Sequence, residues 1–138
     1  MPRIAQEFVD FPYDELQLDQ VWTSTYEIAA ELVDAYDRQV GAHRQSSRRT
    51  APPWVFCTFL PMYRALGGRM EQGSVHVQQT AEHHAVTYVG EVLDVEVRVS
   101  DKRERDGRKR VALETSYRGA ERDLRCRVHT TLLWGYSG

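Results

Sequence analysis

The stretch "APPWVFCTFLPMYRALGG", residues 51–68, constrains the fold more than any other part of the sequence. Almost every side chain from Trp54 to Leu66 is apolar, and two prolines precede this run, as is typical of the first turn of a helix. A helix that is apolar on all sides is buried on all sides. Pro61 predicts a kink or break near Cys57 to Leu60, and the glycine pair that follows Leu66 predicts the end of the helix.

The segment before this run predicts a second, amphipathic helix. We expect a short strand at Val21–Thr23, followed by a capping box in which Ser24 and Glu27 satisfy each other's free backbone N–H groups. Apolar residues then recur with helical spacing up to Gly41, which predicts the helix end. The expected buried face consists of Ile28, Leu32, Val33, Tyr36 and Val40.

The second half of the chain predicts antiparallel strands, each with one buried and one solvated face. Apolar and polar residues alternate over residues 75–81, 93–99, 111–118 and 124–132. Asp106-Gly107 predicts a tight hairpin turn, and a second turn is expected near Gly119 to Arg122. A buried helix needs a sheet wrapped around it, so we expect an α+β hot-dog fold, with residues 1–138 as one domain.

Composition narrows the functional classes. The 138 residues carry a net charge of only −2, which argues against nucleic acid and membrane surfaces as partners. Cys57 and Cys126 lie in apolar segments without metal-ligand spacing, so we interpret both as buried thiols in a reducing cytoplasm. No secretory signal or membrane-spanning run is recognisable, and neither a metal nor a cofactor is expected.

Four stretches, in this order and spacing, carry a resemblance to a known family. The chain resembles the MaoC-like (R)-specific hydratases and dehydratases, and above all their N-terminal-type module and the substrate-binding subunit of the heterodimeric 3-hydroxyacyl-ACP dehydratase. The family usually has Gly-Asp where this chain has Gly90-Glu91. The matching stretches are "YEIAAELVDAYDRQVG" (26–41), "APPWVFCTF" (51–59), "EHHAVTYVGEVLDVEVRVSDKRERDGR" (82–108) and "RVHTTLLW" (127–134).

The resemblance implies a substrate carried as a thioester on coenzyme A or acyl carrier protein, and reversible loss of water from a 3-hydroxyacyl group. That reaction needs an acid/base pair and N–H donors for the thioester oxygen. In the family the donors lie at the start of the buried helix, which corresponds here to Trp54 and Val55. Active members carry an Asp and a His between the two helices, where this chain has Ala42 and Ser47. The resemblance therefore implies a binding subunit without its own pair, in a homodimer or in a heterodimer with another hot-dog subunit.

Other residues near this connection are weaker candidates. His43 is the only titratable base in the connection and is either a displaced acid/base or a solvated loop residue. Arg44, Arg48 and Arg49 form a basic cluster that could contact phosphate or a partner. For His84 we favour a hydrogen-bonding role at the sheet edge over catalysis. His83 and His84 do not suit a metal pair, because neighbours in a strand point to opposite faces.

The basic run from Lys102 to Arg110 also has two interpretations. It meets the phosphates of coenzyme A or an acidic carrier protein, or it is a solvated hairpin. Three functions remain open at this level. They are an acyl-binding dehydratase subunit, an acyl-CoA thioesterase of the same fold, and a non-enzymatic protein that binds acyl chains or other proteins.

Overall fold

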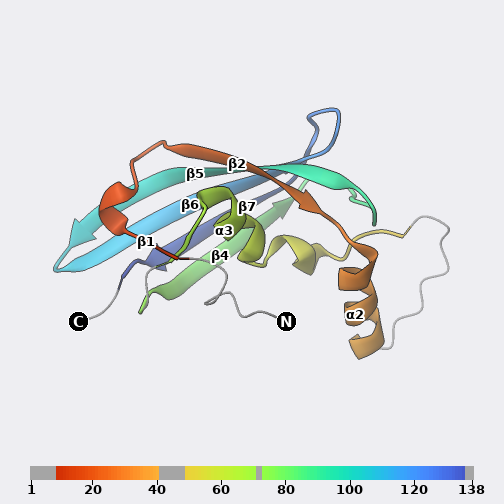
Figure 1. Cartoon of the computed structure of the whole chain (residues 1–138), viewed down its shortest axis with the longest axis horizontal. Helices are drawn as coiled ribbons and strands as arrows, with labels where there is room; N and C mark the ends of the chain where they lie inside the picture. The colour runs from red at the N-terminus through yellow and green to blue at the C-terminus, as the bar shows by residue number, and fades with distance from the viewer. Residues whose placement is uncertain (1–8, 41–48, 71–72, 136–138) are drawn as a thin grey trace.

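Five strands form one antiparallel sheet in the order β2-β5-β6-β7-β4 in the computed structural model, which describes residues 9–40, 49–70 and 73–135 (Figure 1). A short parallel pair, β1 with β3, lies outside this sheet. The strands are β1 (Asp10–Phe11), β2 (Val21–Glu27), β3 (Arg69–Met70), β4 (Val75–His83), β5 (Val92–Arg105), β6 (Arg108–Arg118) and β7 (Leu124–Leu133). The helices are η1 (Tyr13–Glu15), α2 (Ala30–Val40), η2 (Pro53–Phe56) and α3 (Leu60–Leu66).

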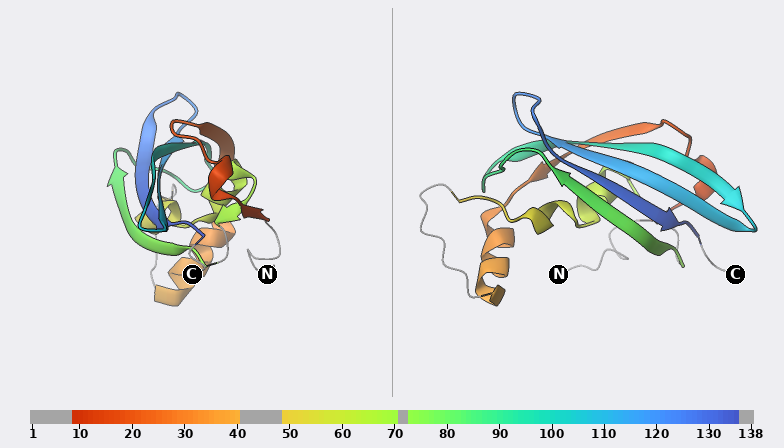
Figure 2. Two further views of the ribbon diagram at one scale, coloured as in Figure 1. Left: turned by 90° about the vertical axis from the view of Figure 1, so that its left-hand side faces the viewer. Right: turned by 180° about the vertical axis from the view of Figure 1, so that it is seen from behind.

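The sheet curls around α3, as the end-on view in Figure 2 shows. Alternate residues of the three middle strands point inward and are fully or almost fully buried, which confirms the predicted alternation there. This arrangement confirms the α+β hot-dog fold class. The inward-facing residues of the middle strands include Leu93, Val95, Val97, Val99, Val111, Leu113, Tyr117, Cys126, Val128 and Leu132.

The central apolar segment is broken where Pro61 predicts it. A 3-10 helix covers Pro53–Phe56, and α3 begins only at Leu60, with Pro61 in its first turn. Proline lacks an N–H and clashes with the preceding turn, so one continuous helix through this position is disfavoured. Gly67 ends α3 with φ of 70°, a left-handed conformation that glycine adopts without steric cost.

The predicted capping box is wrong. Ser24 and Glu27 belong to β2, which runs antiparallel to β5 and pairs Ser24 with Val95. The β-branched and aromatic residues of this segment suit a strand, and pairing with a distant strand overrides the local helix signal. The amphipathic helix begins at Ala30 instead, although the predicted face residues Ile28 and Val33 are both fully buried.

Two further expectations about burial need correction. Val75 and Val77 are each 46% exposed on the edge strand β4, whose register with β7 shifts between His76 and Gln78, whereas Ala81 packs against the core. Cys126 is buried as expected, whereas Cys57 is exposed, at the break between η2 and α3. Both predicted turns are present, and Asp106 and Gly107 have the positive φ angles that a tight hairpin requires. Among the described helices, none combines the length and the apolar character needed to cross a bilayer.

A buried hydrogen bond fixes the broken helix to the sheet. The hydroxyl of Tyr26, on β2, donates to the carbonyl oxygen of Val55 in η2 at 2.9 Å. Both residues are buried, and the Tyr26 ring also packs against Tyr117, with 5.9 Å between ring centroids. The position of η2 relative to the sheet therefore depends on this contact.

Replacing Tyr26 with phenylalanine tests this anchor. Tyr26→Phe leaves the buried Val55 carbonyl without its donor, so we expect the free energy of unfolding to fall by about 1–3 kcal/mol. Urea denaturation followed by circular dichroism measures the change. An unchanged free energy of unfolding would contradict the role of the hydrogen bond.

Candidate functional site

A pocket of about 440 Å³ opens where the chain approaches η2. Two segments far apart in the sequence form its walls, one leading into η2 and one following β4. The ring of Phe56 lies at its base, tilted against His83 with 6.0 Å between ring centroids. The lining residues are Thr50, Ala51, Pro53, Phe56, His83, His84, Ala85, Val86 and Thr87.

Backbone hydrogen bonds hold the two walls together. The N–H of Ala51 donates to the carbonyl of Thr87 at 2.7 Å, and the N–H of Val89 donates to the carbonyl of Arg49 at 2.8 Å. Thr50 forms an isolated antiparallel bridge with Tyr88 between them. The entrance to η2 is thus clamped onto the connection between β4 and β5, and the pocket has a defined shape without a ligand.

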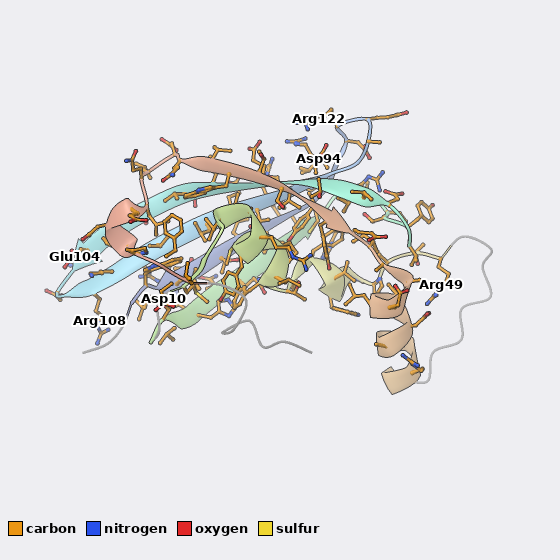
Figure 3. All side chains as sticks on the ribbon, in the orientation of Figure 1. Asp10, Arg49, Asp94, Glu104, Arg108 and Arg122 are labelled. Carbon is orange, nitrogen blue, oxygen red and sulfur yellow. The ribbon has the colours of Figure 1, made fainter. Side chains whose placement is uncertain are left out.

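Arg49 is the one residue of the predicted basic cluster that the structure describes. Its guanidinium pairs with Asp34 of α2 at 2.6 Å, so its charge is already compensated. Figure 3 labels Arg49 beside α2. The pair gives Asp34 a structural role at the end of the clamp. Ala42, His43, Arg44, Ser47 and Arg48 lie outside the described residues.

At the start of η2, one of the two expected N–H donors is already engaged within the chain. The N–H of Val55 donates to the carbonyl of Pro52 at 3.2 Å, and the Val55 side chain is fully buried. Trp54 is half-buried and packs against the core. Neither residue lines the pocket, whereas their neighbours Pro53 and Phe56 do.

Two imidazoles line the pocket instead. His83 is the last residue of β4, opposite Cys126 of β7, and the N–H of His84 donates to the carbonyl of Arg125 at 2.9 Å. Because the strand ends at His83, the rule that neighbours point to opposite faces fails, and both residues contribute to one pocket. Within the described part of the chain, no group of three side chains suited to metal binding is found.

The chemistry available to the described lining is limited. It contains two imidazoles and the hydroxyls of Thr50 and Thr87, and no carboxylate. The Thr87 hydroxyl is buried and has no hydrogen-bond partner among the described residues. Either imidazole can move a proton, but the described lining has no carboxylate to orient one of them or to act as the second acid or base. The sequence led us to consider His83 only as a member of a metal pair, and its place in the pocket lining was not expected.

The nearby thiols are not activated. Burial raises the pKa of Cys126 from 9.0 to about 12, and burial also raises the pKa of Cys57. A thiol is nucleophilic only as the thiolate, so both stay inert at neutral pH. Burial likewise raises the pKa of the hydroxyls of Tyr26 and Tyr117, which therefore remain neutral behind the pocket.

No protein-family model matches the sequence, and no curated protein matches it. Solved structures with similar folds do exist. The (R)-hydratase PhaJ1 from Pseudomonas aeruginosa is 19% identical, with a TM-score of 0.69, over 91% of this chain and 86% of the hydratase. The truncated HadBC (3R-hydroxyacyl-ACP dehydratase) complex from Mycobacterium tuberculosis is 17% identical, with a TM-score of 0.63, over 83% of this chain and 95% of that one.

A third structure widens the range of chemistry on this fold. A thioesterase superfamily member from Thermus thermophilus is 13% identical, with a TM-score of 0.59, over 85% of this chain and 82% of that one.

Cys126 gives a pH-dependent prediction. Its raised pKa means that the unfolded chain loses the thiol proton above pH 9, while the folded chain keeps it to about pH 12. The unfolded state then binds fewer protons, so the free energy of unfolding falls as pH rises through this window, by up to about 1.4 kcal/mol per pH unit for this group. Cys126→Ala should flatten that slope in urea titrations, and an identical slope would refute the assignment.

The similarity to these solved structures agrees with the strand order and the buried helix described above. The chain has the hot-dog fold that the (R)-hydratases and 3-hydroxyacyl-ACP dehydratases share.

Proposed function

We propose that this chain is the acyl-thioester-binding subunit of an enoyl-thioester hydratase or 3-hydroxyacyl-thioester dehydratase. The observation that carries the proposal is a pre-formed pocket whose described lining has imidazoles but no carboxylate. Such a pocket suits binding and orientation, because no carboxylate of this lining orients either imidazole for proton transfer. The Asp and His of active relatives are also missing from the connection before η2, where Ala42 and Ser47 stand.

A catalytic hot-dog partner would supply the missing pair. The solved HadBC dehydratase is itself a complex, which supports this kind of assembly. The edge strand β4 is the natural contact surface, because its outer backbone groups have no neighbouring strand in the sheet. Val75 and Val77 expose apolar side chains on the same strand. A second hot-dog chain pairing along β4 would extend the sheet and would reach the pocket at His83, where the strand ends. We place this assembly in the cytoplasm, which suits two free thiols.

Hydration of crotonyl-CoA tests the proposal. We expect the isolated chain to show no hydration above the uncatalysed rate, because it has Ala42 and Ser47 in place of the Asp and His and no carboxylate in the described pocket lining. Addition of a hot-dog partner that carries the Asp and His should produce activity. Robust hydration by the isolated chain would refute the subunit role, and hydrolysis of the thioester would favour the thioesterase alternative.

A variant that fills the pocket, compared with a matched control, tests whether the acyl group binds there. Ala85 lines the pocket and is exposed, so Ala85→Trp should fill the pocket without disturbing the core. Ala120 is an exposed turn residue away from the pocket lining, and Ala120→Trp is the matched control. We expect at least a tenfold loss of partnered activity for Ala85→Trp and little change for the control. Equal activity of the two variants would place the acyl site elsewhere.

The role of β4 has its own test. Val75→Glu places a charge on the exposed edge and should convert the assembled form, with itself or with the partner, into monomers in light-scattering measurements. Val21 offers a matched control, since it is 47% exposed on the opposite edge strand β2. We expect Val21→Glu to assemble normally. Dissociation by Val21→Glu and not by Val75→Glu would assign the interface to β2.

A further inference from the structure

The β5–β6 hairpin carries a charge pattern that the proposed acyl site does not use. Along the hairpin, Arg103 lies directly opposite Arg110, and Arg105 lies directly opposite Arg108. Residues two apart in a strand point to the same face, so all four guanidiniums share one face of the hairpin. Lys102 and Lys109 belong to the other face, where their ammonium groups lie over the Tyr13 ring.

These four arginines border a hollow of about 600 Å³, which we call the arginine hollow. Strand β7 ends at Leu133, which pairs with Arg110, so the tip of the hairpin projects beyond its neighbour. The hollow lies between this tip and the end of the sheet. Its full lining is Val77, Arg103, Arg105, Asp106, Arg108, Arg110 and Leu133.

The charges in the arginine hollow are poorly compensated. Arg103 pairs with Asp101 at 2.8 Å, but Arg105, Arg108 and Arg110 form no ion pair with any described residue. Elsewhere on the sheet, arginines have carboxylate partners, for example Arg98 with Glu114. Other such pairs are Arg122 with Asp94, Arg125 with Glu91, and Arg127 with Glu114.

Like charges directly opposite each other on neighbouring strands are destabilising. Two such pairs in succession, around a concave space with one carboxylate, Asp106, form a site that an anion would stabilise. Guanidinium groups bind phosphate oxygens in a bidentate manner, and several converging arginines favour a doubly or triply charged group. The volume is that of a small-molecule site, and Val77 and Leu133 offer an apolar surface to the rest of the ligand.

We propose that the arginine hollow binds the phosphate or pyrophosphate group of a small molecule. It is separate from the acyl pocket, since Arg108 and Arg49 lie at opposite ends of the molecule in Figure 3. The proposal does not rest on the acyl-binding function. Coenzyme A and free phosphate compounds share the chemistry that the hollow recognises, and the experiment distinguishes these two sources.

Titration with inorganic pyrophosphate, followed by NMR of the backbone amides at low salt, tests this site. We expect saturable shifts in residues 103–110 and in Leu133. The double variant Arg105→Gln/Arg108→Gln should bind pyrophosphate about tenfold more weakly or worse. It should also be at least as stable as the natural chain, because it removes one opposed pair of like charges. The matched control is Arg118→Gln/Arg122→Gln, which loses the same charge elsewhere and should bind normally.

Two competitors identify the source of the phosphate. Displacement of pyrophosphate by coenzyme A would assign the hollow to the coenzyme, and displacement by ADP alone would assign it to another phosphate compound. Absence of saturable binding, or equal weakening in both double variants, would overturn the proposal. Tighter binding of a polyglutamate peptide than of pyrophosphate would overturn it in favour of a protein-docking surface. Ala85→Trp should leave pyrophosphate binding unchanged, so failure of the acyl site and failure of this one are separable.

Discussion

The break in the central helix before Pro61 is the constraint on which the candidate site depends. A continuous helix would place residues 53–66 along one axis inside the sheet. The break lets η2 turn toward the end of β4, where the Tyr26 hydroxyl holds it through the Val55 carbonyl at 2.9 Å. The hydrogen bond from the N–H of Ala51 to the carbonyl of Thr87 then joins the two walls of the pocket. The shape of the pocket thus follows from one proline, one buried hydrogen bond and one short backbone pairing.

The same geometry is the basis of the proposed binding role. Burial keeps the Cys126 thiol and the Tyr117 hydroxyl protonated, so neither group acts as a nucleophile or a base at neutral pH. The described lining supplies imidazoles without a carboxylate to orient or complement them. The pocket lies next to the edge strand β4, which has no neighbouring strand on one side. In the proposed assembly, a second chain that pairs along β4 would cover this edge and bring a carboxylate to the pocket.

The sequence predicts the middle of the sheet well and its margins poorly. Strands β5, β6 and β7 have a core on one face and water on the other, so alternation alone identifies them. Alternation cannot distinguish an edge strand from a central one, which is why Val75 and Val77 were expected to be buried. Ser24 to Glu27 has the local pattern of a helix start, but its pairing with β5 is a contact between distant residues that no local pattern reveals.

The candidate site was even less predictable, because its walls meet through pairing of residues 49–51 with residues 87–89. The position of a strand end decides that His83 and His84 share the pocket, and a shift of one residue would have separated them. The expected N–H donor of Val55 was lost to a local bond with Pro52, which a 3-10 turn makes and a sequence pattern does not reveal. The arginine pattern of the hairpin was visible in the sequence, but its opposed pairing required the register of β5 and β6.

The central proposal is that the isolated chain binds an acyl thioester but lacks the Asp/His acid/base pair that a partner would supply. NMR of butanoyl-CoA in deuterated water, with the isolated chain present, tests both halves in one sample. The account predicts saturation transfer from the protein to the acyl protons, with no exchange of the α-protons for deuterium beyond the rate without protein. Rapid α-proton exchange, or the absence of saturation transfer to the acyl chain, would contradict it.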